Sequence, residues 1–228
     1  MSFGLGISLR HLHGQYRDRI LTSLTILLLF LMFVVAPLQA AGSIVFEAFA
    51  FILGLVMIAD ALVMSGSSIA FVMMSVAFCM IGAAVISRLH KPSILNIYLL
   101  AGAWLIIAIT FSSVVARAVF APGRVTYHRI HGAILLYLLI AVIFMALYVF
   151  VSLLFPGAIS GISFEDSPAL ASNLIYFSFT TLTTTGYGDI FPVHPLARSL
   201  SNLESIVGQL YPATLLARLV TLEIADRG

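Results

Sequence analysis

The sequence predicts an all-α membrane protein with six spanning helices and one shorter helix. Two observations lead to this fold class. Of the 228 residues, 61% are hydrophobic and only 9% are charged, and the mean hydropathy is +1.13. A soluble domain of this length would have too few polar and charged residues to cover its surface. The apolar residues are also gathered into segments of about 20 residues, which is the length that crosses a bilayer.

The expected spanning helices follow a tail of residues 1–19 and occupy 20–38, 43–64, 69–86, 94–120, 130–155 and 196–222. Arg17 and Arg19 before the first apolar segment resemble the start of a secretory signal. That segment is longer than the apolar part of such signals, and Leu38 is unsuited to a cleavage site, so we expect it to remain as a helix. Cys79 is the only cysteine, so no disulfide can form within one chain.

A seventh apolar segment, 168–182, is expected to form a helix that stops halfway across the membrane. Ser167 and Pro168 form a typical helix start, with a capping hydroxyl followed by proline at the first helical position. Glu165 and Asp166 would lie near the positive end of the helix dipole. At about 15 residues the helix is too short to span. Its negative C-terminal end would therefore point into the interior of the protein.

The segment after this half-helix, Thr183-Thr184-Thr185-Gly186-Tyr187-Gly188-Asp189, has the residues that a cation-binding backbone needs. Carbonyl oxygens can replace the water around an ion only where the backbone adopts conformations that glycine permits and other residues resist. Gly186 and Gly188 supply this freedom. The segment resembles the selectivity filter of the potassium channel superfamily, whose usual pattern is Thr-Val-Gly-Tyr-Gly-Asp. Thr185 stands where valine is commonest.

This resemblance, to six-helix, one-pore-loop potassium channels of the bacterial type, implies a site for potassium ions. The residues that would hold the ions are Thr184, Thr185, Gly186, Tyr187 and Gly188. Asp189 would concentrate cations at the outer mouth. The chain has one such segment and a pore of this type needs four, so the expected partners are three further copies of the chain. The pore domain, 130–222, would comprise an outer helix 130–155, a pore helix 168–182, a filter 183–189 and an inner helix 196–222.

The inner helix carries the second part of the resemblance. Many members of the superfamily have a gating hinge at a glycine, and Gly208 stands at the same spacing, 19 residues after Asp189. Pro212 would leave the carbonyl of Gly208 without its helical hydrogen bond, which weakens the helix at the same place. The alternative is that this glycine only lets neighbouring helices approach closely.

One face of the inner helix is expected to line a central cavity. Its residues are Ser205, Gln209, Pro212, Leu216 and Val220, with Gln209 as the polar wall below the filter. Rings of apolar side chains can close a pore by excluding water, and Leu216 and Val220 lie nearest the cytoplasm. Packing against the helix 130–155 is the alternative role for these two residues.

Charged residues within the apolar segments are few. Glu204 precedes Gly208 by one helical turn and could bond to a hydroxyl of the half-helix, Ser178 or Thr180, and so tune the filter from behind. A water pocket on the outer side is the alternative environment for Glu204. Asp60 and Arg117 lie near the inner ends of their helices and could neutralise each other.

Residues 20–121 occupy the place of the voltage-sensing domain in six-helix potassium channels. A sensor helix repeats Arg or Lys at every third residue, whereas Arg117 is the only basic residue in 94–120. Steep voltage gating uses about 3–4 charges per subunit. We therefore expect a voltage-sensor-like domain without strong voltage gating.

The distribution of basic residues predicts that both termini are cytoplasmic and that the filter opens outward in an integral plasma (inner) membrane protein. On that topology the inside holds Arg10, Arg17, Arg19, Arg117, Arg124, Arg129, Arg218 and Arg227, and the outside holds Arg88, Lys91 and Arg198. The loop from Arg88 to Lys91 is an exception to the general excess of Lys and Arg on the cytoplasmic side.

The function expected from these observations is passive potassium conduction through a tetrameric pore. The alternatives are a weakly selective monovalent cation channel, a potassium transporter subunit and a non-conducting membrane scaffold. No catalytic set, phosphate-binding loop or basic patch for nucleic acid is evident in the sequence. We therefore expect no enzyme activity, no nucleic-acid partner and no cofactor other than the permeant ion. Membrane lipids are expected neighbours, and any regulatory partner is unknown.

Overall fold

The computed structural model describes residues 20–42, 54, 56, 67–90, 93–120 and 127–227. Within some helices the side chains are not described, namely those of residues 89, 90, 128, 168 and 218–227. The tail 1–19, nearly all of the expected helix 43–64 and its residue Asp60 lie outside the described residues, as does the side chain of Val220. The expected pairing of Asp60 with Arg117 therefore stays a prediction.

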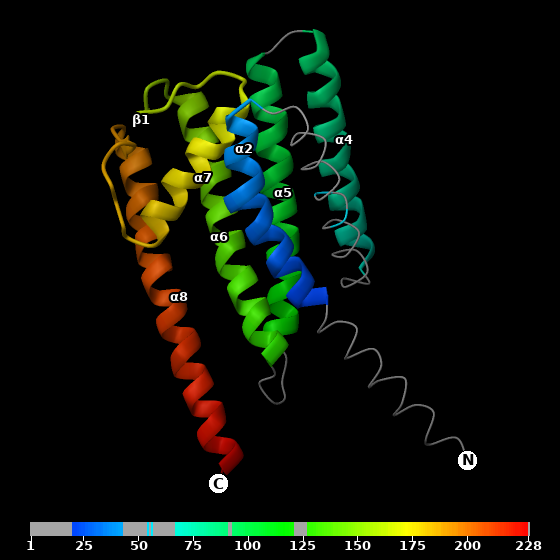
Figure 1. Ribbon diagram of the computed structural model, residues 1–228, viewed down its shortest axis with the longest axis vertical. Helices are drawn as coiled ribbons and strands as arrows, with labels where there is room; N and C mark the ends of the chain where they lie inside the picture. Colours follow the sequence, from blue (N-terminus) through cyan, green and yellow to red (C-terminus); the bar gives the residue numbers. More distant parts are fainter. Residues whose placement is uncertain are drawn as a thin grey trace, which may run out of the picture.

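The described part of the protein is mostly helical, and its long helices lie side by side (Figure 1). Among the described residues, four helices are long and apolar enough to cross a membrane. They are Ile20–Ala40, Ser68–Arg88, Ile94–Val119 and Arg129–Leu154. The first includes a π-helical segment, η1 (Leu31–Val35), and ends in α2 (Ala36–Ala40). The others belong to α4 (Ser68–His90), α5 (Ile94–Val119) and α6 (Tyr127–Leu154).

The described residues also include helices α7 and α8. The short helix α7 (Pro168–Leu182) covers the same residues as the half-helix expected from the sequence. Helix α8 (Pro195–Arg227) has 33 residues and extends well beyond the end of α6 in Figure 1. At about 1.5 Å per residue, its length is sufficient to span a membrane.

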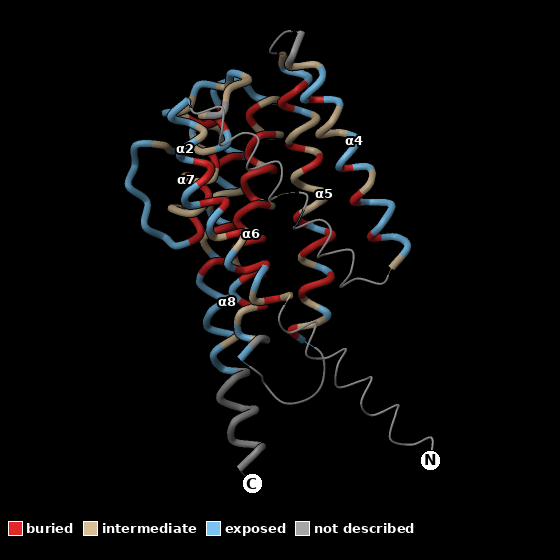
Figure 2. The backbone as a smooth tube through the Cα atoms, turned by 45° about the vertical axis from the view of Figure 1, so that its right-hand side comes forward, coloured by how far each residue is buried: buried red, intermediate tan, exposed pale blue. Residues whose placement is uncertain are grey.

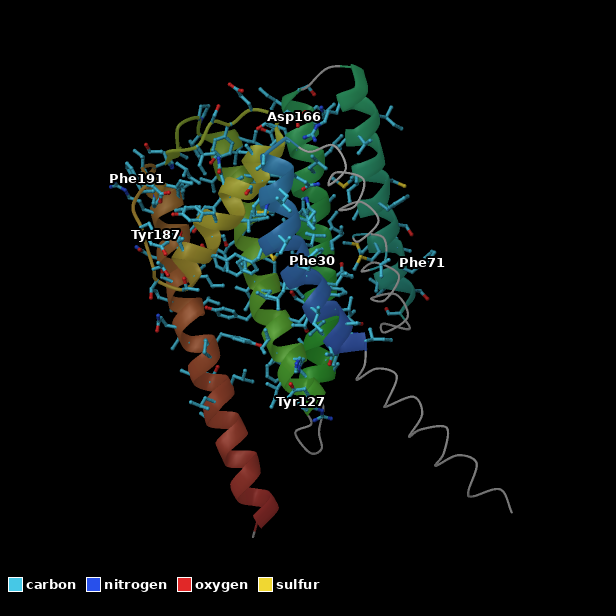
Figure 3. All side chains as sticks on the ribbon, in the orientation of Figure 1. Phe30, Phe71, Tyr127, Asp166, Tyr187 and Phe191 are labelled. Carbon is cyan, nitrogen blue, oxygen red and sulfur yellow. The ribbon has the colours of Figure 1, made fainter. Side chains whose placement is uncertain are left out.

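The buried core is centred on α6, with α5, the helix Ile20–Ala40 and α7 packed around it (Figure 2). Thr25 shows how the first helix is attached, since its hydroxyl donates to the His131 carbonyl of α6 at 3.0 Å. Farther along the same helix, the ring of Phe33 lies 5.0 Å from that of Phe179 in α7. By contrast, α4 exposes large apolar side chains such as Ile69 and Phe71, as expected for contact with lipid. Figure 3 shows Phe71 on the outer side of α4.

A pair of short antiparallel strands, which the sequence analysis did not predict, joins the segments on either side of α7. Strand β1 (Ile159–Ser160) pairs with β2 (Phe191–Pro192), so that Ile159 lies opposite Pro192. Gly161 follows β1 with a φ of +87°, and a Cβ there would collide with the carbonyl oxygen of Asp189. The close approach of these two backbones requires glycine, and it fixes the end of the segment that follows α7.

A partly buried ion pair connects the C-terminal end of α4 to the residues just before α7. The Arg88 guanidinium donates to Asp166, which also accepts a hydrogen bond from the Asn96 side chain at 2.7 Å. Burial raises the pKa of Asp166, but the hydrogen bonds from Arg88 and Asn96 and the charge of Arg88 outweigh it and hold the pKa below its usual value. The C-terminal end of α4 therefore lies on the same side of the protein as the N-terminal end of α7.

The expected cap of α7 is only partly present. Ser167 does occupy the N-cap position, with an extended backbone, but its hydroxyl makes no capping hydrogen bond. Asp166 interacts with Arg88 and Asn96, so its carboxylate is held by side chains of α4 and α5 in addition to any attraction to the helix dipole.

Candidate functional site

The segment 183–189 is hydrogen-bonded to the C-terminal end of α7. The N–H of Thr184 donates to the Thr181 carbonyl at 3.0 Å. The N–H groups of Thr185 and Gly186 both donate to the Thr180 carbonyl, at 2.8 and 3.1 Å. The last carbonyls of a helix have no partner within it, so the following segment can satisfy them. As a result, the N–H groups of the first half of the segment, through Gly186, face α7.

The backbone of this segment has a left-handed residue at every second position. The φ angles are +57° at Thr184, +54° at Gly186 and +84° at Gly188. In an ordinary strand successive carbonyls point to opposite sides, whereas a left-handed residue at alternate positions turns them toward one side. Within the described part of the chain, no hydrogen bond to the carbonyl oxygens of Thr184 to Gly188 is found. These oxygens are free to bind a cation.

Thr184 is the only described residue other than glycine with a positive φ. This conformation is costly for a residue with a Cβ, and such strain is typical of functional sites. Two hydrogen bonds stabilise Thr184 in this conformation. Its N–H donates to the Thr181 carbonyl, and its hydroxyl accepts from the Gln209 amide at 2.9 Å. Gln209, expected below the filter, thus contacts Thr184, the first of the predicted ion-binding residues, directly.

Aromatic side chains brace the outer half of the segment. The ring of Tyr187 stacks on that of Tyr176 in α7, with centroids 6.2 Å apart and planes within 4° of parallel. The Tyr176 hydroxyl donates to the Asp189 carboxylate at 3.0 Å. In the single chain Tyr187 is 73% exposed, and Figure 3 shows it beside the upper end of α8. Tyr176 therefore connects the expected outer-mouth acid to the pore helix.

The hydroxyl of Thr185 has a defined partner. Thr183 donates to the Phe179 carbonyl at 2.7 Å, and its oxygen lies 2.8 Å from the Thr185 hydroxyl. Because the single proton of Thr183 is used by the carbonyl, Thr185 is the donor between the two hydroxyls. The added hydroxyl of Thr185 is therefore turned back toward the end of α7.

Helix α8 packs closely against the end of α7. A Cβ on Gly208 would overlap the carbonyl oxygen of Leu182, so glycine is required for the two helices to approach this closely. Three residues earlier, the Ser205 hydroxyl donates to the Thr181 carbonyl at 3.2 Å, which turns Ser205 toward α7. This geometry supports the close-packing alternative for Gly208 and leaves a hinge at this position as a prediction.

Three of the residues of α8 that were predicted to line a cavity are exposed in the single chain. Pro212 lies inside the helix, which continues past it to Arg227. Gln209, Pro212 and Leu216 are exposed in the single chain, and Leu216 has an exposed fraction of 63%. Their exposure is compatible with a cavity-lining face, and the role of Leu216 in closing the pore stays a prediction.

Glu204 is fully buried between α6, α7 and α8. Its carboxyl accepts a hydrogen bond from the Tyr148 hydroxyl of α6 at 2.6 Å. Its other oxygen lies 2.5 Å from the hydroxyl of Ser178 in α7. The predicted contact with Ser178 is present, whereas the Thr180 hydroxyl donates to the Phe177 carbonyl instead. The alternative of an outer water pocket is wrong, since Glu204 has no exposed surface.

Sequence reasoning did not identify Tyr148, Tyr176 or the pairing of Arg88 with Asp166. Tyr176 is the one tyrosine of α7 and stands 11 positions before Tyr187, and this spacing is the signal that could have identified it. Tyr148 is one of several tyrosines in the apolar helices, and only its partner Glu204 makes it distinctive.

Residues 134–224 match the family model described as "Ion channel". The match covers about two fifths of the chain and contains most of α6, all of α7, the segment 183–189 and nearly all of α8. Comparisons with curated proteins and with solved structures gave no match. With the four apolar helices, the match indicates an integral membrane protein whose C-terminal part is similar to ion channels.

Proposed function

We propose that this chain forms a homotetrameric potassium channel, with the filter residues Thr184 to Gly188 binding the permeant ion. The observation that carries the proposal is the alternation of left-handed residues in this segment. The N–H groups of Thr184, Thr185 and Gly186 bond to carbonyls of α7, and the carbonyl oxygens of Thr184 to Gly188 have no partners among the described residues. Rings of such carbonyls replace the hydration shell of potassium in channels of this kind.

Four copies are proposed because one chain supplies one side of the ion path. The segment 183–189 is exposed along its whole length in the single chain. An adjoining face of α8 exposes large apolar side chains, each more than half exposed: Leu203, Ile206 and Leu210. Contact between copies would cover this apolar surface and place the four filters around one axis.

Thr185 is compatible with potassium selectivity in this arrangement. Its hydroxyl donates to Thr183, so it adds no free polar group on the far side of the backbone. The side chain can therefore occupy the place of the usual valine. A weakly selective cation channel is the outcome that would show this argument to be insufficient.

We place the filter mouth and the loop between α4 and α5 outside the cell and both termini in the cytoplasm of a plasma (inner) membrane. The ion pair between Arg88 and Asp166 supports this topology, because it holds the C-terminal end of α4 beside the start of the pore helix. Arg117 is the one basic residue of α5, and one charge yields only about 2.3 kcal/mol per 100 mV. Opening is therefore not strongly voltage-dependent.

The test is reconstitution of the purified protein into liposomes, with potassium and sodium fluxes measured for the parent and for Gly186→Ala. Gly186 has a φ of +54° and open space where a Cβ would be, so the variant strains the filter backbone without a steric clash. We expect potassium flux in the parent and the loss of potassium preference in the variant.

Gly157→Ala is the matched control. Gly157 also has a positive φ, +80°, with nothing near the position of a Cβ, but it lies in the turn after α6. Gly157→Ala should keep the parent's preference for potassium. Equal potassium and sodium fluxes in the parent, or an unchanged preference in Gly186→Ala, would overturn the proposal.

A further inference from the structure

Glu204 is the only carboxyl side chain among the buried residues that the structure describes. The titratable groups facing it from α6 are the hydroxyls of Tyr148 and Tyr137. From α7, the Ser178 hydroxyl contacts Glu204. The hydroxyls of Thr181 in α7 and Ser201 in α8 lie beside the Tyr148 hydroxyl. No Lys, Arg or His belongs to this described group, so an ionised Glu204 would have no cation to pair with.

The hydrogen bonds around Ser178 can be counted proton by proton. Its Oγ lies 2.5 Å from Glu204 Oε1 and 2.9 Å from the carbonyl oxygen of Ala141 in α6. A hydroxyl has one proton to donate, and a backbone carbonyl has none. If Ser178 donates to Ala141, the short contact with Glu204 needs its proton from the carboxyl group.

Tyr148 accounts for the other oxygen. Its hydroxyl donates to Glu204 Oε2 at 2.6 Å, so the carboxyl group can carry its own proton on Oε1 and still have both oxygens bonded. An ionised Glu204 would instead take the Ser178 proton away from Ala141. The carbonyl of Ala141 and the oxygen of Ser178 would then face each other without a proton, which is costly in a buried site.

We propose that Glu204 is protonated in the folded protein and, as the donor to Ser178, positions the pore helix α7 against α6. The chain of bonds runs from Glu204 through Ser178 to Ala141 and so joins α8, α7 and α6. Ser178 lies two residues before Thr180, whose carbonyl holds the N–H groups of Thr185 and Gly186. Glu204 is therefore a positioning residue that acts on the filter through α7.

The effect on conduction rests on the proposed function, whereas the protonation state does not. The first experiment therefore measures the proton alone. Infrared difference spectra between the parent and Glu204→Gln should show the C=O stretching band of a protonated carboxylic acid in the parent. Glu165→Gln is the control, because Glu165 is an exposed carboxyl residue before α7 and the same substitution there should leave the Glu204 band in place. A carboxylate band for Glu204 near neutral pH would overturn the proposal, whether or not the protein conducts.

The second experiment measures potassium flux in liposomes as the pH is raised from about 6 to about 9, a range in which buried carboxyl groups can lose their proton. Glutamine reproduces the neutral acid, since its amide can donate to Ser178 and its oxygen can accept from Tyr148. We expect flux in the parent to fall by about three- to tenfold, which corresponds to the loss of one hydrogen bond, and flux in Glu204→Gln to stay constant.

Ser178→Ala removes the link without changing the carboxyl group. It should lower flux at every pH, whereas Glu204→Gln should keep the flux that the parent shows at low pH. Identical pH profiles for the parent and Glu204→Gln would overturn the positioning role. Absence of potassium flux in the parent would instead contradict the proposed function and leave the infrared result to decide the protonation state.

Discussion

Replacing Gly208 with alanine distinguishes close packing from hinge bending at the middle of α8. If the glycine served only to make the helix flexible, alanine would stabilise the helix by about 1 kcal/mol, the difference in helix propensity between the two residues. The structure predicts the opposite sign, because the added Cβ would overlap the carbonyl oxygen of Leu182.

The size of the effect follows from what the methyl group meets. Overfilling a packed interior costs about 1–3 kcal/mol, and a backbone carbonyl at the end of α7 cannot rotate away as a side chain would. The upper part of that range, less the gain of about 1 kcal/mol in propensity, leaves a net loss of about 2 kcal/mol. For a chain of this size the loss corresponds to a fall in Tm of about 4–8 °C.

The assay is thermal unfolding of the purified protein in detergent, with Gly82→Ala as the matched control. Gly82 lies inside α4, and no atom would lie within 4 Å of an added Cβ. Gly82→Ala should leave the Tm unchanged or raise it, while Gly208→Ala lowers it. A Gly208→Ala protein as stable as the Gly82→Ala protein would refute the close-packing argument.

Two further predictions follow from contacts of the pore helix and the filter. The pKa of Asp166 is lowered on folding, so its ion pair with Arg88 stabilises the protein above the ordinary carboxyl pKa of about 3.9 and is lost as the pH falls through the lower folded value. The Tm advantage of the parent over Asp166→Asn should therefore disappear on acidification below about pH 4, and an advantage constant to lower pH would contradict the ion pair. Gln209→Leu removes the hydrogen bond to the strained Thr184 and should lower the potassium-to-sodium flux ratio by about three- to tenfold, whereas an unchanged ratio would show that this bond does not support the filter.

The local features of the pore region could be predicted from the sequence because they depend on neighbouring residues. Pro168 and the length of the following apolar segment predicted the half-helix, and α7 has those bounds. Gly186 and Gly188 predicted a backbone with unusual conformations, and both have positive φ angles. Thr184 was predicted as an ion ligand, but its own left-handed conformation could not be predicted, because a threonine adopts it only when the surrounding contacts impose it.

The tertiary contacts were less predictable because their partners are far apart in the chain. Arg88 and Asp166 are separated by 78 residues, and each had a simpler local explanation, as a loop cation and as a residue near a helix dipole. The pairing of β1 with β2 joins segments of only two residues each, too short to give an alternating pattern. Glu204 was singled out because a carboxyl group is rare in an apolar helix, yet Tyr148 as its partner required the packing of α6 on α8.

The contacts of α8 with α7 also limit where the inner helix can bend. Two successive turns of α8 contact the end of α7 and the segment after it. On the first turn, Glu204 contacts Ser178 and Ser205 contacts Thr181. On the second turn, Gly208 lies against Leu182 and Gln209 contacts Thr184. Bending at or before Gly208 would break these contacts and disturb the filter that they support. Pro212 is the first weak point beyond them, because it lacks the N–H that would bond to the Gly208 carbonyl. In the proposed channel, movement of the lower part of α8 about Pro212 would therefore open or close the end of the pore opposite the filter while the filter stays in place.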